Sequence, residues 1–195
     1  MPRRSAEDVA RSRATTIEGA VAVASRVGLE GLTIGRLAES LGMSKSGLAG
    51  RFASKLELQL AALEEAAAIF RRHVYDPALA APAGRPRLEA ICDAWIAYLG
   101  DCPFPGGCFL TTASVEFDAR PGPVQDAVRR DMRRWVGVLE HEAATAVQQG
   151  ELDADPADLA FAINALAVGA NCDYQLHGDR RSLQRARRAM AALMG

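Results

Sequence analysis

A short segment near the N-terminus gathers side chains that can donate hydrogen bonds or positive charge to phosphate oxygens. The chain has only two lysines, Lys45 and Lys55, and both lie in this segment, where Ser44 and Ser46 flank the first of them. Ammonium groups and serine hydroxyls are typical donors to the phosphates and base edges of nucleic acids. Arginine-rich coding bias explains why lysine is scarce elsewhere, but it does not explain why these two remain.

The charge of the chain is unevenly distributed. Residues 1–60 carry nine Lys and Arg against six Asp and Glu, a net charge of about +3. Residues 61–195 carry 14 basic and 18 acidic groups, about −4, so the net charge of −1 for the whole chain hides the asymmetry. Because phosphate neutralisation supplies much of the affinity for DNA, a basic N-terminal module on an acidic body is typical of a DNA-binding protein.

The elements that position these side chains follow from the spacing in residues 33–58. Thr33 fits the N-cap of a short helix, Gly42 provides a turn after it, and Ser44 caps a second short helix. The pattern predicts a helix-turn-helix followed by a longer third helix, and the second helix of such a motif lies in the DNA major groove. The apolar face of the first helix consists of residues at helical spacing: Ile34, Leu37, Ala38 and Leu41.

Residues 33–58 resemble the DNA-binding region of the TetR family of bacterial transcriptional regulators. Upstream, residues 15–33 are similar to the first helix of that family and the glycine-containing turn after it. Downstream, residues 51–58 are similar to the entry into its fourth helix. The resemblance implies a ligand-responsive regulator, a repressor that releases its operator when a small molecule binds the C-terminal domain. The helix within residues 15–33, which precedes the helix-turn-helix, is predicted to have one apolar face: Ile17, Ala20, Val21, Ala24 and Val27.

The resemblance also implies roles for individual residues. Ser44, Lys45 and Ser46 open the recognition helix and are expected to face base edges or phosphates. Lys55, in the first turn of the long helix, is expected to hold a backbone phosphate together with the N-terminal amides of that helix. Four N-terminal arginines form either a basic arm near the minor groove or a solvated tail: Arg3, Arg4, Arg11 and Arg13. The complete set expected to contact double-stranded operator DNA is Thr33, Arg36, Ser44, Lys45, Ser46, Arg51 and Lys55.

The recognition helix departs from the family pattern at three positions. Many members have an aromatic residue that touches phosphate where this chain has Ala49, and Gly47 and Gly50 add two glycines. Glycine inside a helix costs about 0.5–1 kcal/mol relative to alanine. The helix is therefore expected to be soft in isolation and to be held by Leu48 and Phe52, which pack inward.

The remaining sequence predicts helices only, so the expected fold is all-α. We expect a helix-turn-helix DNA-binding domain over residues 1–53 and a larger helical effector-binding and dimerisation domain over residues 54–195. The chain lacks an apolar signal segment and a run of 18 apolar residues, which predicts a cytoplasmic protein without a membrane span. The helix that follows the DNA-binding module is predicted to bury one stripe of side chains: Leu56, Leu60, Leu63, Ala67, Phe70 and Val74.

Five further helices are expected beyond the long one. Asp155 and Asp179 are predicted to cap the last two helices, and the helix that starts at Pro123 is predicted to end at Gly150. That helix carries one apolar side: Val124, Val128, Trp135 and Leu139. The expected spans are 86–100, a short helix ending near 119, 123–150, 156–177, and a last helix after Asp179.

The segment from Leu159 to Leu176 is apolar on most faces and rich in small residues. A helix that is apolar all round is buried, either at a dimer interface or in the core of a monomer. In the TetR family the corresponding helices of two subunits build a four-helix interface, and such a dimer suits an operator whose half-sites lie about 34–36 Å apart. The residues expected at a homodimer interface are Phe161, Leu166, Ala170 and Tyr174.

The body is also expected to hold a pocket for a small-molecule effector, because the TetR family places its ligand among the middle helices. Each candidate is also compatible with a plain core role. The identity of the ligand does not follow from the sequence, although an apolar or aromatic molecule fits the lining. The candidate lining residues are Phe70, Trp95, Tyr98, Phe104, Phe109, Phe117, Trp135, Asn164 and Asn171.

Other chemistries leave weaker signals. Cys102 and Cys108 have a C-x5-C spacing that is not a standard zinc motif, so they form either a redox or metal sensor or a loop in which cysteines only pack. The three histidines lack metal-ligand spacing, and we predict neither an enzyme nor a bound cofactor or metal. A small-molecule-binding protein that has lost DNA binding is a further alternative, suggested by Gly47, Ala49 and Gly50.

Overall fold

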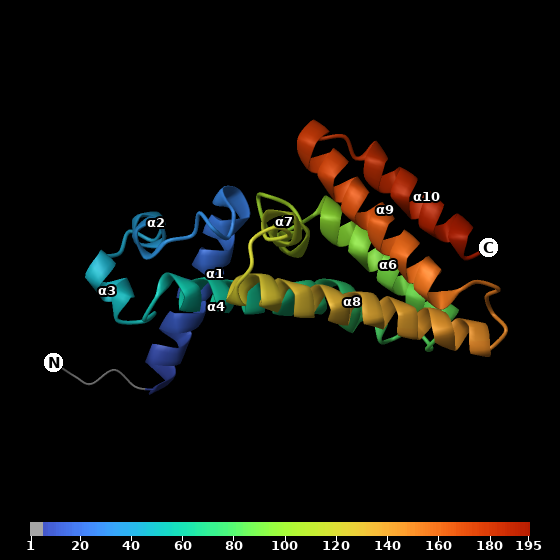
Figure 1. Cartoon of the computed structure of the whole chain (residues 1–195), viewed down its shortest axis with the longest axis horizontal. Helices are drawn as coiled ribbons and strands as arrows, with labels where there is room; N and C mark the ends of the chain where they lie inside the picture. The colour runs from blue at the N-terminus through green and yellow to red at the C-terminus, as the bar shows by residue number, and fades with distance from the viewer. Residues whose placement is uncertain (1–5) are drawn as a thin grey trace. The chain divides into compact units, whose positions relative to one another are not determined.

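The computed structural model describes residues 6–195, with side chains from residue 12 onward. Every regular element in this part of the chain is helical, so the predicted all-α fold is confirmed (Figure 1). None of its helices is both long and apolar enough to cross a membrane. The elements are α1 (Ala6–Val27), α2 (Ile34–Ser40), α3 (Lys45–Ala49), α4 (Lys55–Phe70), the π-helical η1 (Arg71–Tyr75), α5 (Asp76–Ala78), α6 (Arg85–Gly100), α7 (Phe109–Glu116), α8 (Pro123–Gln148), α9 (Pro156–His177) and α10 (Arg181–Leu193).

The two short helices of the predicted helix-turn-helix are capped as the sequence indicates. Thr33 Oγ1 accepts a hydrogen bond from the backbone N–H of Arg36 at 3.2 Å and caps α2. Ser44 Oγ accepts one from the N–H of Gly47 at 3.1 Å and caps α3. Between them Gly42 adopts a φ of +62°, a left-handed conformation that glycine enters without a steric penalty. These three residues therefore define the turn.

The core of this module follows the predicted pattern with two differences. Ala20, Val21 and Ala24 are buried as expected, but Val27 is 42% exposed at the end of α1. α1 also begins at Ala6, upstream of the predicted start. The side chains that complete the core are almost fully buried: Leu29, Leu32, Leu37, Leu48 and Phe52. Leu48 anchors the five-residue α3 as predicted, because a helix that short has little stability of its own.

The predicted stripe of the long helix is wrong at its start. Leu56 is 38% exposed, although Phe70 and Val74 at the other end are buried as expected. Leucines lie on more than one side of this helix, so their spacing does not distinguish the buried side. The helix also does not stay α-helical, because it passes into the π-helical segment η1 before α5. The face that α4 buries is Leu58, Ala62, Leu63, Ala66, Ile69 and Phe70.

The chain divides into two compact units. The first contains the chain up to Ala67 together with Phe104–Val128, and the second contains Ala68–Pro103 and Arg129–Gly195. α4 and α8 each contribute residues to both units. The first unit therefore combines the helix-turn-helix with α7 and the start of α8. The expected domain division between residues 53 and 54 remains a prediction.

Within the second unit, α9 packs against α10, and α6 contacts both of them (Figure 1). Asp155 Oδ1 caps α9 by accepting from the N–H groups of Ala157 and Asp158 at 2.9 and 3.0 Å. Asp179 Oδ1 accepts from the N–H of Arg181 at 2.9 Å at the start of α10. The predicted cap of α9 is therefore present, whereas the N-cap position of α10 is Arg180, and Asp179 binds the first N–H of that helix from one residue upstream. The predicted apolar side of α8 is also confirmed, because all of its members are buried: Val124, Val128, Trp135 and Leu139.

A buried carboxylate holds the loop before α6. Glu142 on α8 is 1% exposed, and it accepts hydrogen bonds from the N–H of Gly84 at 3.0 Å and from Arg87 Nη1 at 3.3 Å. Arg87 also donates to the carbonyl of Ala81 at 3.1 and 3.2 Å. A buried charge without its partners is strongly destabilising, so this network depends on all of its members.

We predict that Glu142→Ala lowers the free energy of unfolding by about 3–5 kcal/mol, because it leaves Arg87 partly buried without its carboxylate. Urea denaturation followed by circular dichroism measures the change. Glu140→Ala is the matched control, since Glu140 is exposed on the same helix and a surface substitution changes stability by about 0.5 kcal/mol or less. Equal stability of the two variants would contradict a structural role for Glu142.

Candidate nucleic-acid interface

The N-terminus of α3 presents a small group of hydrogen-bond donors to solvent. Lys45 is the first residue of this helix, and its side chain and those of Ser44 and Ser46 are exposed. The two serine hydroxyls lie 3.4 Å apart. Although Ser44 Oγ is occupied as an acceptor by the helix cap, its hydroxyl hydrogen remains available as a donor. An ammonium and two hydroxyls at a helix N-terminus are well suited to bind anionic phosphates.

Two of the expected contact residues lie at the start of α2. Thr33 is half-buried, and its hydroxyl can donate outward while it accepts the cap hydrogen bond. The Arg36 side chain is exposed and donates to the carbonyl of Gly31 at 3.4 Å. Since that contact is long and lies at the surface, Arg36 can exchange it for a phosphate at little cost.

Arg51 is engaged inside its own module. Its Nη1 donates to the carbonyl of Ser12 at 3.0 Å and to Thr16 Oγ1 at 2.6 Å, both on α1. Thr16 is only 2% exposed, so the guanidinium lies against the surface of α1. The sequence indicated a cation after α3, but only the fold reveals that this cation ties the end of α3 to the first helix.

Arg13 behaves in the same way. It donates to the carbonyl of Arg51 at 3.0 Å, pairs with Glu57 at 3.3 Å, and lies over the ring of Phe52 with 5.1 Å to the ring centroid. Arg13 therefore packs on the module and is not part of a free arm. Arg3, Arg4 and the side chain of Arg11, which were assigned to the same arm, lie outside the described residues.

Lys55 is paired with an acidic side chain, Glu30, which local sequence patterns do not connect to it. Its Nζ lies 2.6 Å from Glu30 Oε1 in the turn between α1 and α2, and the two side chains are 40% and 46% exposed. The hydrogen bond from Lys55 is the main reason why the pKa of Glu30 is lowered from its ordinary value. An exposed pair of this kind contributes little to stability, so Lys55 can leave Glu30 for a stronger anion.

A second carboxylate holds the same turn from a distant part of the chain. Glu116, the last residue of α7, accepts hydrogen bonds from the N–H groups of Leu29 and Glu30 at 2.7 and 3.0 Å. Gly28 makes this approach possible: its φ is +77°, and a Cβ at this position would lie 2.5 Å from Glu116 Oε1. The turn that leads into the helix-turn-helix is thus built around the carboxylate of Glu116.

Comparison with protein families agrees with this geometry. Residues 17–62 match the family model for bacterial regulatory proteins of the tetR family, and residues 84–190 match the model for a tetracyclin repressor-like C-terminal domain. The chain belongs to the TetR family. It therefore has the fold of a transcriptional regulator with a helix-turn-helix DNA-binding domain, and regulators of this family are generally not enzymes.

Solved structures of the family have the same fold. A TetR transcriptional regulator from Chloroflexus aurantiacus J-10-FL is 25% identical, with a TM-score of 0.85 over 94% of this chain and 93% of that one. A TetR-family regulator from Cytophaga hutchinsonii is 21% identical, with a TM-score of 0.82 over 99% and 96%. AibR, solved in complex with isovaleryl coenzyme A and operator DNA, is 20% identical, with a TM-score of 0.77 over 93% and 97%. Comparison with curated protein sequences gives no match.

The residues expected to line a TetR-type effector pocket are divided between the two units. Four of them form one aromatic cluster in the second unit: Phe70, Trp95, Tyr98 and Trp135. Their ring centroids lie 4.7–5.7 Å apart in edge-to-face pairs, and all four side chains are buried. Three others belong to the first unit. Phe104 and Phe109 pack with 6.2 Å between their ring centroids, and Phe117 is also buried.

Polar atoms of the second unit are left without partners. The indole Nε1 atoms of Trp95 and Trp135 and the side-chain oxygen of Asn164 are buried and have no hydrogen-bond partner among the described residues. Asn171 is 3% exposed on the same helix as Asn164. A buried polar group without a partner costs about 1–3 kcal/mol. A bound molecule that forms hydrogen bonds with these unpartnered donors or with the unpartnered acceptor would therefore remove part of this free-energy cost.

The expected dimer residues lie on different sides of α9. Phe161 is 71% exposed, Leu166 and Tyr174 are half-buried, and Ala170 is buried within its own chain. Exposed apolar side chains on one helix are unusual in a monomer when they form a contiguous surface. Leu176 extends the same surface toward the end of α9, with 77% of its side chain exposed.

The two cysteines proposed as a sensor are placed in different units. Cys108 is 1% exposed at the N-cap position of α7, whereas Cys102 is half-buried in the second unit. The described residues contain no group of three or more His, Cys, Asp or Glu side chains that could hold a metal ion. The thiol-sensor alternative thus gains no support from the geometry, and it remains a prediction.

We predict that Glu116→Ala speeds hydrogen exchange of the Leu29 and Glu30 amides about 10–100-fold. A hydrogen bond to a charged group contributes about 1.5–3 kcal/mol, and this substitution removes the acceptor of both amides. Exchange measured by NMR tests the effect residue by residue. Asp118→Ala, an exposed acidic position just beyond α7, is the control that should leave both rates unchanged. Unchanged protection in the Glu116 variant would show that the turn does not depend on this carboxylate.

Proposed function

We propose that this TetR-family regulator is a homodimeric repressor that binds operator DNA through α3 and releases it when a small molecule binds the helical body. The main observation in support of this proposal is the exposed group of hydrogen-bond donors at the capped N-terminus of α3, formed by Ser44, Lys45 and Ser46. Arg36 and Thr33 flank this group from the start of α2 as phosphate contacts. Lys55 joins them when it leaves Glu30, and Arg51 supports the interface by fixing α3 to α1.

Lys45 carries the central test, because its charge is not tied to a carboxylate by any ion pair within the described residues. We expect Lys45→Ala to weaken operator binding by about 1–3 kcal/mol and to reduce the salt dependence by about one phosphate contact. Fluorescence anisotropy with the DNA that flanks its own gene, at two salt concentrations and against a scrambled duplex, measures both quantities.

Arg185→Ala is the matched control for this titration. Arg185 is an exposed cation on α10, so its removal changes the net charge equally without touching the helix-turn-helix. An unchanged affinity and salt slope for Lys45→Ala would refute the proposed role of α3. Equal binding of operator and scrambled DNA by the parent protein would instead favour a small-molecule-binding protein without sequence-specific DNA binding.

The aromatic cluster supports an effector that combines an apolar body with hydrogen-bond acceptors. Its rings offer an apolar surface, and the two indole N–H groups require hydrogen-bond acceptors. An apolar or aromatic molecule that carries a carbonyl or carboxylate satisfies both requirements. Because the rings pack against one another, such a molecule has to displace at least one of them. That displacement gives the effector a differential affinity for two conformations, as ligand-dependent release requires.

The open face of α9 supports the homodimer. Phe161 and Leu176 are the two most exposed large apolar side chains among the described residues, and the small residues Ala165 and Gly169 lie exposed between them. Small side chains let two helices approach closely, and a two-fold symmetric contact uses the same face on both subunits. A dimer also presents two copies of α3 to a palindromic operator.

We predict that Phe161→Glu converts the protein into a monomer, because it places a charge within this apolar face. Light scattering at micromolar concentration gives the molar mass. Val115→Glu is the control: Val115 is 63% exposed on α7, so the same substitution there should leave the mass unchanged. A parent protein that is already monomeric, or a dimeric Phe161 variant, would contradict this interface.

A further inference from the structure

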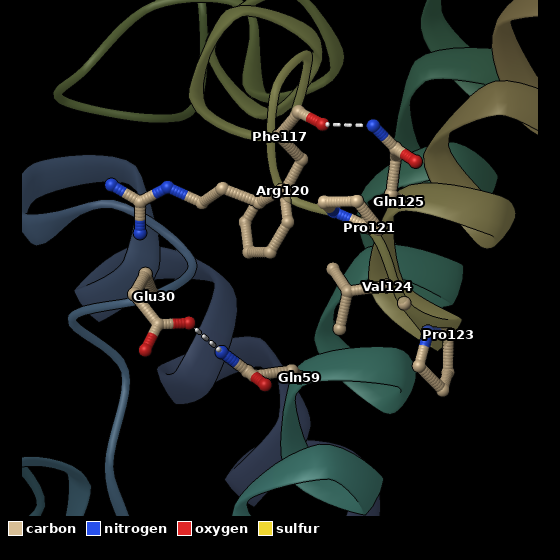
Figure 2. Close-up of a pocket in the computed structure, with 9 residues that line it drawn as sticks. Glu30, Gln59, Phe117, Arg120, Pro121, Pro123, Val124 and Gln125 are labelled. Carbon is tan, nitrogen blue, oxygen red and sulfur yellow. Dashed lines mark hydrogen bonds between the residues drawn. The ribbon is translucent and has the colours of Figure 1, made fainter.

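A separate pocket lies in the first unit, beside the turn that holds Lys55. Its volume is about 280 Å³, slightly below the range typical of drug-sized ligands, and it is open to solvent. Figure 2 shows how three segments meet around it. Glu30 comes from the turn after α1 and Gln59 from α4, and the opposite wall is the segment from Phe117 to Gln125.

One wall of this pocket consists of hydrogen-bond acceptors. Glu30 is ionised at neutral pH, as glutamate ordinarily is. Its pKa is lowered further, chiefly by the hydrogen bond from Lys55 and to a smaller extent by the charge of Arg120. Gln59 is 5% exposed, and its amide N–H group donates to the carbonyl of Leu29 at 2.8 Å. The same amide donates to Glu30 Oε2 at 3.4 Å (Figure 2). Its amide oxygen accepts no hydrogen bond from the described residues. This side of the pocket therefore offers a carboxylate and an unused amide oxygen.

The opposite wall combines apolar side chains with Arg120 and Gln125, and its aromatic ring already attracts the Arg120 cation. Phe117 is 5% exposed, and Val124 and two prolines line the pocket beside it. The guanidinium carbon of Arg120 lies 6.0 Å from the centroid of the Phe117 ring. Gln125 braces this wall by donating to the carbonyls of Phe117 and Asp118 at 2.9 and 2.8 Å. Apolar side chains opposite a carboxylate form the arrangement that recognises organic cations.

We propose that this pocket binds a small organic cation, an amidinium or ammonium group on an apolar body. The charged group of the ligand binds Glu30 and Gln59, and its apolar body packs against Phe117 and Val124. All of these residues belong to the first unit, so the site is distinct from the aromatic cluster assigned to the effector. Arg120 also lines the pocket, and its charge acts on Glu30 and opposes the charge of the ligand, so it limits the affinity.

The pocket is coupled to DNA binding through the carboxylate of Glu30. In the absence of a ligand Glu30 holds Lys55 Nζ at 2.6 Å. A ligand cation competes for the same carboxylate and releases Lys55 to a DNA phosphate, while Glu116 keeps the backbone of the turn in place. By linkage, DNA that takes Lys55 also frees Glu30 for the ligand, so each raises the affinity of the other. This coupling, unlike the pocket itself, rests on the proposed role of Lys55.

Calorimetry on the full chain with three probes of nearly the same shape tests the pocket. Benzamidine carries a cation, benzamide is neutral, and benzoate is an anion. We expect benzamidine alone to bind, Glu30→Gln to weaken it at least tenfold, and Arg120→Gln to leave it unchanged or tighten it. Tyr98→Phe, a substitution in the aromatic cluster, is the control that should have no effect.

Three results would overturn the proposal. The first is that benzamidine does not bind. The second is that benzamidine binds equally well to the parent and to Glu30→Gln. The third is that benzoate binds and this binding is lost in Arg120→Gln, a result that would make the pocket an anion site. Circular dichroism of Glu30→Gln confirms that it is folded, as expected for a substitution in an exposed ion pair.

Anisotropy with operator DNA then tests the coupling. We expect saturating benzamidine to tighten binding several-fold in the parent and not in Lys55→Ala, which should still bind benzamidine in the calorimeter. Unchanged operator affinity in the parent would overturn the coupling. If the parent binds no operator at all, the repressor proposal fails, but the calorimetric result still decides whether the pocket binds a cation.

Discussion

The DNA-binding module depends on a carboxylate that arrives 87 residues after the turn it supports. Glu116 satisfies two backbone N–H groups at the entry to the helix-turn-helix, and Gly28 leaves the space that this side chain needs. Turns of this kind have few local means to satisfy their donors, so an acceptor from elsewhere decides their conformation. As a result, the module folds around α7, and a displacement of α7 changes the turn that carries Glu30.

The two carboxylates at this turn make different kinds of contact. Glu116 binds backbone, which fixes position, whereas Glu30 binds the side chain of Lys55 at the surface, which is easily exchanged. Arg51 and Arg13 are committed to contacts with their own module. The basic N-terminal segment therefore offers fewer cations to DNA than its composition suggests. In the proposed DNA complex, the cations that remain for phosphate contacts are Lys45, Arg36 and, once it leaves Glu30, Lys55.

The sequence predicted the elements whose causes are local. Thr33 and Ser44 cap their helices by contacts three residues away, and Gly42 turns the chain between them. It did not predict which side of α4 is buried, because leucines occupy several sides and the choice depends on packing. It also did not reveal the contacts of Arg51, Lys55 and Glu116, whose partners lie 25 to 87 residues away. Caps and turns can be predicted from local sequence patterns, whereas ion pairs between residues far apart in the sequence can be identified only from the three-dimensional structure.

The same distinction separates the proposed effector site from the proposed DNA-binding surface. A surface donor such as Lys45 can bind a ligand whenever its side chain is exposed to solvent, but a pocket exists only if the packing of the core leaves a cavity. Here four of the predicted pocket residues fill the space with one another, and edge-to-face contacts of this kind stabilise the packed state by about 0.5–1.5 kcal/mol each. An effector that binds here as proposed has to offset those contacts, and hydrogen bonds to the two indole donors that lack acceptors can compensate for part of that loss. An unsatisfied donor next to a replaceable ring contact thus makes the packed conformation sensitive to a ligand.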